Sequence, residues 1–239
     1  MLSLLRKNRD AVLQHLAEAA HAAGREPASI ELVAVTKTVR PEVALGLAEL
    51  GQLDLGENRI ASLEEKVAFF QAKGREVRWH FIGHLQRNKA RRVARLVHTI
   101  HAVDTPALLA TLGRISAEEG LRPGLYLQVK LNDEEAKYGL SPQAVPELVR
   151  EAGDQGARLL GLMTMAPLVE ADPAAKSAAA RDTFERLAAL AAELPAASFD
   201  GGRPRLSMGM SGDLTEAVEA GADTVRIGTA LFRGLEEAA

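Results

Sequence analysis

Short apolar segments with the pattern of buried strands alternate with segments of helical pattern from residue 31 onward. Eight such runs each precede a helix or a helical turn. They span residues 31–37, 53–58, 79–84, 99–104, 124–131, 157–165, 205–210 and 224–232. This alternation is typical of parallel strands joined by crossover helices. Eight units within 239 residues predict an α/β fold, a single (β/α)8 TIM barrel. A doubly wound open sheet is the alternative, and it would leave unpaired edges.

A further helix is expected before the first strand, over residues 2–23, because its apolar residues fall on one face. This apolar face consists of Leu5, Val12, Leu16 and Ala19. The segment lacks the order of a signal peptide, and no apolar run is long enough to span a bilayer, so we expect a cytoplasmic protein. No linker composition interrupts the chain. We therefore expect one domain over residues 1–239, with the barrel at about 31–235.

Composition excludes several classes of function. The chain has no cysteine, which excludes disulfides, thiolate catalysis and cysteine-ligated metals. Its 29 basic and 32 acidic residues give a net charge of −3, so no overall basic field attracts nucleic acid. A basic run at residues 87–95 favours a solvated helix face, and contact with phosphate or nucleic acid is the lesser alternative.

Polar residues gather where the expected strands end, which is where barrels of this type carry their chemistry. Lys37 ends the first strand, Asn58 follows the second, and His84 ends the third. Lys37 either emerges into water, with its stem along apolar surface, or serves a pocket at this end of the barrel. The gathering of polar residues at one end of nearly every strand favours the pocket.

Two segments in the last two units suit an anion. Residues 208–213, MGMSGD, form a glycine-containing turn that opens a helix, and Gly228 and Thr229 lie at the mouth of the last expected strand. Loops after the seventh and eighth strands of such barrels frequently bind phosphate, so we expect a phosphate site there. The alternative assigns the glycines to turn geometry and Ser211 to a helix N-cap.

Arg226 and two histidines stand within expected strands. Arg226 needs a partner if it is buried, either a carboxylate from a neighbouring strand or a ligand atom. His80 and His84 share one strand face, but four extended residues separate them by about 13 Å, too far to share a metal ion. We therefore expect no metal site, with His80 a hydrogen-bonded core histidine and His84 facing the pocket.

Several stretches together resemble the pyridoxal phosphate homeostasis protein family, whose barrel is similar to the N-terminal domain of alanine racemase. The matching stretches are AVTKT (34–38), GEN (56–58), WHFIGHLQRNK (79–89), GLMTMAP (161–167), LSMGMSGD (206–213) and VRIGTALF (225–232). They run in the family order and cover nearly the whole chain. The resemblance implies a protein that binds the cofactor pyridoxal 5′-phosphate (PLP).

The resemblance also implies a role for each matched residue. Lys37 would form a Schiff base with the PLP aldehyde, and Arg226 would face the pyridine nitrogen. Ser211, Gly228 and Thr229 would hold the phosphate. Asn58 would lie beside the cofactor, Ser207 and Met208 near its ring, and His84 in the neighbourhood of the pocket. A lysine amine attacks an aldehyde only when it is neutral, so a site that desolvates the ammonium would favour this role.

The function implied is PLP homeostasis or carriage inside the cell, with PLP-dependent apo-enzymes as candidate partners and without a vigorous catalytic cycle of its own. An arginine can only donate to the ring nitrogen, which leaves the ring a weak electron sink and suits limited chemistry. The alternatives are an amino-acid racemase of fold type III and a Schiff-base aldolase. A racemase needs a second acid–base group opposite Lys37, and nothing places Tyr126 or Tyr138 there. We expect a monomer that binds neither nucleic acid nor membrane.

Overall fold

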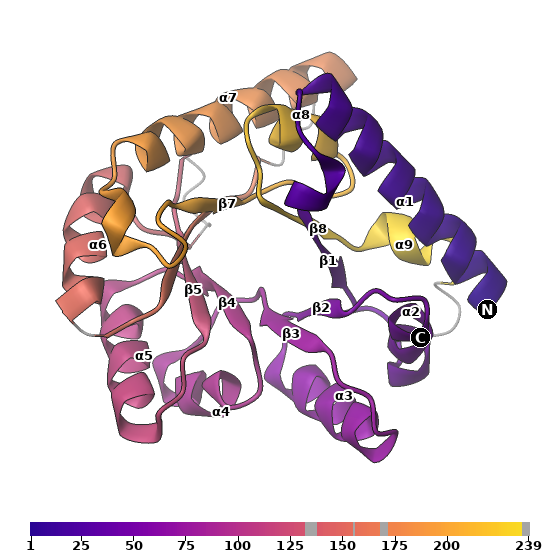
Figure 1. Cartoon of the computed structure of the whole chain (residues 1–239), viewed down its shortest axis with the longest axis horizontal. Coiled ribbons are helices and arrows are strands. Elements are labelled where there is room, and N and C mark those ends of the chain that lie inside the picture. Colours follow the sequence, from indigo (N-terminus) through magenta and orange to yellow (C-terminus); the bar gives the residue numbers. More distant parts are fainter. Residues whose placement is uncertain (132–137, 155, 168–171, 236–239) are drawn as a thin grey trace.

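The strands of the computed structural model, which describes residues 1–131, 138–154, 156–167 and 172–235, form a closed barrel (Figure 1). All eight strands are parallel and follow one another in sequence order, and β8 pairs with β1. The strands are β1 (Glu31–Val35), β2 (Asp54–Glu57), β3 (Arg78–Phe81), β4 (Thr99–Val103), β5 (Gly124–Gln128), β6 (Leu159–Met163), β7 (Arg205–Ser207) and β8 (Thr224–Ile227). The predicted TIM barrel is confirmed, and closure through β8 and β1 rules out the open sheet.

Helices surround the barrel and cover the outer faces of the strands (Figure 1). They are α1 (Leu2–Ala22), α2 (Pro41–Glu49), α3 (Ile60–Ala72), α4 (Ala90–Ala94), α5 (Pro106–Glu119), α6 (Val145–Asp154), α7 (Pro173–Ala192), α8 (Leu214–Glu219) and α9 (Thr229–Phe232). Short 3-10 turns are η1 (Pro27–Ser29), η2 (Arg87–Lys89), η3 (Pro142–Ala144) and η4 (Ala196–Ser198). Because helices lie outside and side chains fill the interior, the strands are buried on both faces, which explains their continuous apolar pattern.

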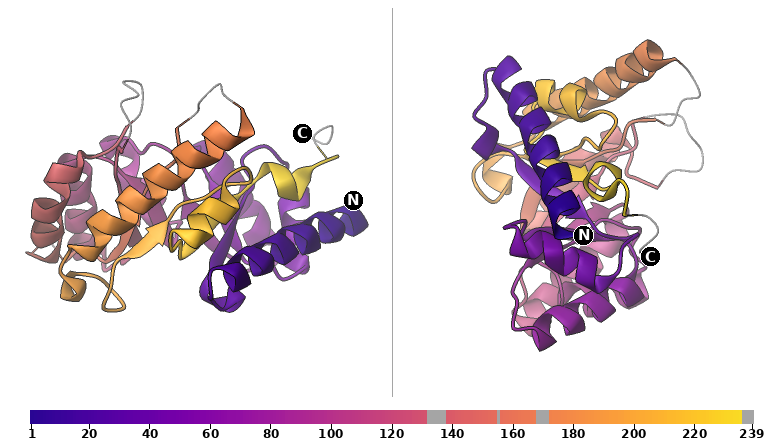
Figure 2. Two further views of the ribbon diagram at one scale, coloured as in Figure 1. Left: turned by 90° about the horizontal axis from the view of Figure 1, so that it is seen from above. Right: turned by 90° about the vertical axis from the view of Figure 1, so that its right-hand side faces the viewer.

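The N-terminal helix α1 lies along the outside of the barrel, against α8 and α9 (Figure 2). The four residues of its predicted apolar face, Leu5, Val12, Leu16 and Ala19, are all buried. Asn8 adds a polar tie, because its side-chain nitrogen donates to the Leu231 carbonyl at 3.1 Å and to the Arg233 carbonyl at 2.9 Å. The helix therefore joins the beginning of the chain to its last two units.

The strands end earlier than the sequence indicates. The expected last strand, 224–232, is wrong in its second half, because β8 ends at Ile227 and α9 begins at Thr229. In the same way β3 ends at Phe81, so His84 lies beyond the strand and does not share a strand face with His80. The ladder pairing of β8 with β1 stops at Ile227, and that of β3 with β2 stops at Phe81.

The basic run at 87–95 forms η2, α4 and the residue that follows them. Arg92 pairs with Glu64 of α3, while Arg91 and Arg95 pair with Glu119 of α5. The side chains of these three arginines are 37–59% exposed, which confirms the predicted solvated helix face, and their charges pair with carboxylates of neighbouring helices. In the part of the chain that the structure describes, no helix has the length and apolar character needed to cross a membrane.

Candidate functional site

A cavity of about 490 Å³ opens at the carboxyl ends of the strands. Six of the nine residues that the sequence assigns to the site line it: Lys37, Asn58, Ser211, Arg226, Gly228 and Thr229. Val35, Ile82, Met163, Met165 and Met210 contribute apolar wall. Loops after β1, β2, β7 and β8 thus bring together residues that are up to 192 positions apart in the chain.

Lys37 stands two residues beyond the end of β1, and its side chain is exposed at the cavity. A desolvated lysine at the end of the strand is therefore not what the structure has, because β1 ends at Val35 and Lys37 lies in the loop beyond it. Hydrogen bonds with Lys66 and Glu57 hold Thr36, the residue before Lys37, in place. Lys66 of α3, which is 2% exposed, donates to the Thr36 carbonyl at 2.8 Å and to Glu57 Oε1 at 2.5 Å. The Thr36 hydroxyl also donates to Glu57 Oε1, at 2.6 Å.

Asn58 is held at the cavity wall by a close approach between two loops. A Cβ atom on Gly83, which follows β3, would lie 2.2 Å from the Asn58 carbonyl oxygen. Because no side chain fits there, a glycine at this position lets the loop after β2 pack directly on the loop after β3. The backbone of Asn58 is therefore positioned by packing.

Arg226 lies on β8 with its guanidinium at the cavity, and it is only 5% exposed. Its Nη1 donates to Ser207 Oγ at 2.6 Å, and its Nη2 donates to the Thr164 carbonyl at 3.0 Å. These hydrogen-bond partners are a hydroxyl and a carbonyl rather than the neighbouring carboxylate that we considered. Burial lowers the pKa of Arg226 to about 10, although the charge of Asp213 opposes the shift. The side chain therefore remains a cation near neutral pH, with N–H groups left for a ligand.

The turn at 208–213 and the segment after β8 form one polar rim. Gly209 has φ +93°, and a Cβ there would lie 2.5 Å from the Ala217 side chain, so this position requires glycine. The Asp213 side chain, which precedes α8, accepts from the Met210 N–H at 2.5 Å and closes the turn. Burial raises the pKa of Asp213.

A contact between Ser211 and Ala230 joins the two halves of this rim, since the Ala230 N–H donates to Ser211 Oγ at 3.4 Å. Within the described parts of the chain, no residue accepts a backbone hydrogen bond from Ser211, Gly212 or Gly228. Thr229, the first residue of α9, has no intrahelical acceptor for its N–H either. The rim thus presents free donors suited to an anion.

The remaining three predicted residues lie away from the cavity wall. Met208 is fully buried in the core between barrel and helices. Ser207 is also fully buried, and its Oγ accepts a hydrogen bond from the Arg226 guanidinium. His84 is exposed: its Nδ1 bonds Asp104 Oδ2 at 2.7 Å, and its ring stacks on Tyr138 with centroids 4.0 Å apart. Direct contact of these three with a cofactor stays a prediction.

Two sets of buried polar residues escaped the sequence analysis. The first is the ion pair of Lys66 and Glu57. The second surrounds His80, which is a fully buried, hydrogen-bonded histidine as expected, bonded to Asp54 and to His101. Lys66 interrupts the apolar stripe of α3 and was detectable from that position, whereas the partnership of His80 and His101 depends on how β3 and β4 align.

Comparison with known proteins places this geometry among related barrels. The family described as alanine racemase, N-terminal domain, matches residues 8–236. A pyridoxal phosphate homeostasis protein of Deinococcus radiodurans is 37% identical over 223 residues, covering 93% of this chain and 98% of the relative. One of Pseudomonas aeruginosa is 39% identical over 237 residues, covering 97% and 96%.

Solved structures agree with these relatives. PipY of Synechococcus elongatus, in a structure with PLP bound, has a TM-score of 0.75 and 33% identity, and the match covers 91% of this chain and 99% of that one. An alanine racemase of Clostridium difficile has a TM-score of 0.68 at 14% identity, over 92% of this chain and 56% of that one. The latter likeness concerns the fold alone.

Proposed function

The chain belongs to the pyridoxal phosphate homeostasis protein family, and from this membership we propose that it binds PLP and acts in the homeostasis or carriage of that cofactor inside the cell. The observation that carries the proposal is the cavity itself, where Lys37, Arg226 and the polar rim face one space. The PLP bound in the structure of PipY supports it.

The residues of the cavity fit the aldehyde, the ring nitrogen and the phosphate of PLP. Lys37 offers an amine for the aldehyde, Arg226 offers N–H donors for the ring nitrogen, and the rim around Ser211 offers free backbone donors for the phosphate. Apolar side chains between them can cover the ring. When bound, PLP supplies an aldehyde that bonds covalently to amines and a ring that withdraws electrons.

Lys37 and Arg226 favour carriage over vigorous catalysis. A guanidinium has no acceptor and can only donate a hydrogen bond to the ring nitrogen, so Arg226 disfavours a protonated ring and limits the electron withdrawal on which catalysis by the cofactor depends. Two hydrogen bonds to Ser207 and Thr164 hold this cation in place. Lys37 is exposed, so an incoming amine can reach the point of attachment from solvent.

A racemase needs a second acid–base group that faces Lys37 across the substrate. Among the described residues that line the cavity, none is a tyrosine or a histidine. Tyr126 is buried inside the barrel, where its hydroxyl bonds Thr224 at 3.2 Å, and Tyr138 stacks on His84. These positions support carriage as the first function and leave racemisation as the alternative.

The test is an absorption spectrum of the purified protein, followed by borohydride reduction and peptide mass mapping. We expect a visible band and a reduced pyridoxyl-phosphate adduct on Lys37. Lys37→Ala should lose both, while the matched control Lys89→Ala, an exposed lysine outside the cavity, should keep both. A protein that stays colourless and unmodified after incubation with PLP refutes the proposal. Racemisation of alanine at an ordinary enzymatic rate would favour the alternative, and a phosphorylated sugar trapped on Lys37 would indicate an aldolase.

Further aspects of the function stay predictions. We expect transfer of PLP to PLP-dependent apo-enzymes, which mixing the loaded protein with an apo-enzyme and following the recovery of its activity would detect. We also expect a monomeric, single-domain, cytoplasmic protein. Size-exclusion chromatography with light scattering measures the first of these properties, and a mass of twice the 25.5 kDa chain would contradict it.

A further inference from the structure

A chain of buried hydrogen bonds runs through the barrel, from Arg226 at the cavity to Asp54 near the opposite mouth. Arg226 Nη1 donates to Ser207 Oγ at 2.6 Å, and Ser207 Oγ lies 2.8 Å from His101 Nδ1. His101 Nε2 lies 3.0 Å from His80 Nδ1, and His80 Nε2 lies 3.0 Å from Asp54 Oδ1. Ser207, His101 and His80 are completely buried, so the side chain of each must find its hydrogen-bond partners within this row of residues.

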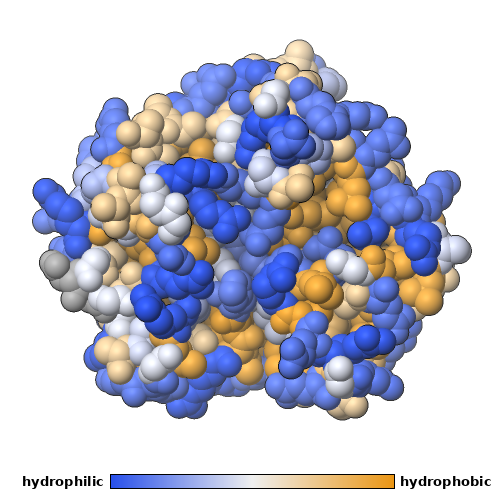
Figure 3. Space-filling model, in the orientation of Figure 1, coloured by the Kyte–Doolittle hydropathy of each residue, from blue (hydrophilic) through white to orange (hydrophobic). Residues whose placement is uncertain are grey.

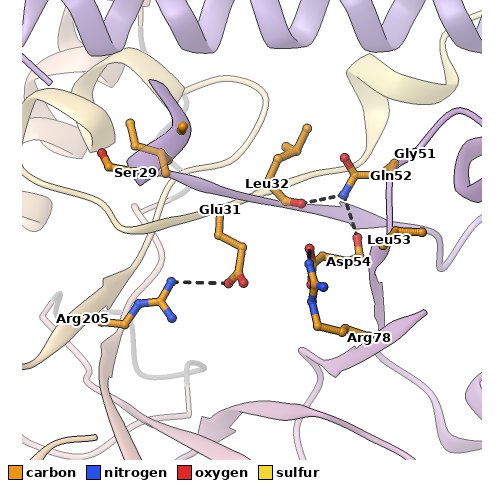
Figure 4. A pocket seen from close by; sticks show the side chains of 11 residues that line it. Ser29, Glu31, Leu32, Gly51, Gln52, Leu53, Asp54, Arg78 and Arg205 are labelled. Carbon is orange, nitrogen blue, oxygen red and sulfur yellow. Dashed lines mark hydrogen bonds and ion pairs between the residues drawn. The ribbon is translucent and has the colours of Figure 1, made fainter. Parts of the chain in front are cut away.

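Asp54 belongs to a second pocket, which lies at the amino ends of the strands (Figure 4). Hydrophilic side chains also gather in the middle of the face seen in Figure 3. The potential ligand atoms of Glu31, Asp54 and His80 lie within 4.8 Å of one another. Arg78 already pairs with Asp54, and Arg205 lies 3.7 Å from Glu31, so both carboxylates are neutralised by arginines and the group makes a poor metal site.

The carboxylate of Asp54 determines which atom donates in each of these hydrogen bonds. Burial alone would raise the pKa of Asp54, but hydrogen bonds from His80 and Arg78 outweigh burial and lower it, so the group is an anion that only accepts. His80 Nε2 must therefore carry the hydrogen. Arg78 already balances the charge of Asp54, so a second, fully buried cation at His80 would be uncompensated. In the tautomer with its one hydrogen on Nε2, His80 accepts through Nδ1.

The remaining hydrogens follow from His80. His101 donates through Nε2, which leaves its Nδ1 as an acceptor for the Ser207 hydroxyl. The Ser207 hydroxyl then donates its only hydrogen to His101, and its oxygen accepts from Arg226. Burial lowers the pKa of His101 well below its ordinary value, which agrees with a neutral ring. Every hydrogen bond in the chain therefore points away from the cavity.

We propose that His101 and His80 are positioning residues for the cofactor site, which act through Ser207 to hold the Arg226 guanidinium in one orientation, with Asp54 fixing both histidine tautomers. This inference rests on the proposed function, because Arg226 lines the proposed PLP cavity. Ser207, which the resemblance places near the ring, acts through Arg226 instead of touching the cofactor. A substitution at Asp54, at the amino-end mouth of the barrel, then alters how a ligand binds in the cavity at the carboxyl-end mouth.

Nitrogen-15 NMR of the wild-type protein without added PLP tests the chain independently of the cofactor. The protein has only six histidines, so His80→Gln and His101→Gln variants suffice to assign the two buried rings. We expect both to be neutral and protonated at Nε2 alone at neutral pH. A hydrogen on Nδ1 of His101, or a doubly protonated His80, would overturn the proposal.

A pair of matched variants tests the effect on the cofactor. Asp54→Asn and Glu31→Gln each remove one carboxylate charge from the same pocket, but only Asp54 belongs to the chain. We expect Asp54→Asn to shift the absorption maximum of bound PLP and to weaken its binding about fivefold, while Glu31→Gln stays within about twofold of the wild type. Equal effects of the two variants, or none from Asp54→Asn, would overturn the proposal.

Substitutions of His101 separate positioning from packing. His101→Leu breaks the chain, whereas His101→Gln keeps one donor and one acceptor and should restore much of the wild-type spectrum. If both variants fold and give the same spectrum, His101 serves packing alone and the proposal is wrong. Failure of the wild type to take up PLP would refute the proposed function instead, and the NMR spectra would still confirm or refute the direction of the chain.

Discussion

The buried ion pair of Lys66 and Glu57 supports the chain directly behind Lys37, and Lys66→Met is the sharpest test of that role. Lys66 is 2% exposed and Glu57 is fully buried, with 2.5 Å between Nζ and Oε1. Removing one partner leaves the other charge uncompensated in the interior, which costs about 3–5 kcal/mol. At roughly 2–4 °C per kcal/mol for a domain of this size, the Tm should fall by about 6–20 °C.

Urea denaturation of four proteins measures this effect: wild type, Lys66→Met, Glu57→Gln and the double variant. The double variant removes both charges, so we expect it to recover most of the loss, with a coupling energy of about 2 kcal/mol or more. Arg92→Met is the control, because it breaks an exposed pair with Glu64 and should cost at most about 1 kcal/mol. The reasoning is refuted if Lys66→Met costs no more than Arg92→Met, or if the two single losses simply add.

Three further predictions concern other parts of the molecule. Arg226→Glu should shift the absorption of bound PLP by stabilising a protonated ring nitrogen, and an unchanged spectrum with PLP still bound would show that Arg226 does not face that atom. Gly209→Ala should lower the free energy of unfolding by about 2 kcal/mol or more, measured in urea, because φ is +93° and the new Cβ would meet Ala217 at 2.5 Å; a neutral effect would contradict this geometry. Burial lowers the pKa of His101, so below about pH 6.5 the unfolded chain binds a proton that the folded chain does not. Stability should therefore be complete above that pH and fall as the pH drops, by up to about 1.4 kcal/mol per pH unit, and His101→Leu should flatten the slope.

The fold and most of the cavity were predictable because both follow from local pattern and one general rule. Alternating strand and helix patterns identify each unit separately, and parallel strands bring their carboxyl ends to one edge. Lys37, Asn58 and Arg226 could therefore be assigned to one site without knowing any distance. Where each strand ends was less accurate, because ladder pairing between neighbours decides it, as at Ile227.

The interior network was not predictable in the same way. Lys66 gives a local signal, since it occupies the apolar stripe of α3 together with Leu63 and Val67. The contact of His80 with His101 depends on the stagger of β3 against β4, and that of His101 with Ser207 joins residues 106 positions apart across the barrel. Such contacts arise from closure of the barrel, and no local pattern encodes them.

The closing seam between β1 and β8 has a consequence for how the protein is made. Lys37 lies early in the chain, while Arg226 and the rim around Gly228 lie near its end, and α1 packs on α8 and α9 across the same seam. During synthesis β1 keeps the edge that pairs with β8 unpaired until residues to about 230 have left the ribosome. Contacts of such long sequence separation form slowly, so this edge is the point at which a newly made chain is most exposed to aggregation. The cavity proposed for the cofactor is completed by the same closure of β8 on β1, and therefore only a chain whose barrel has closed can hold the ligand.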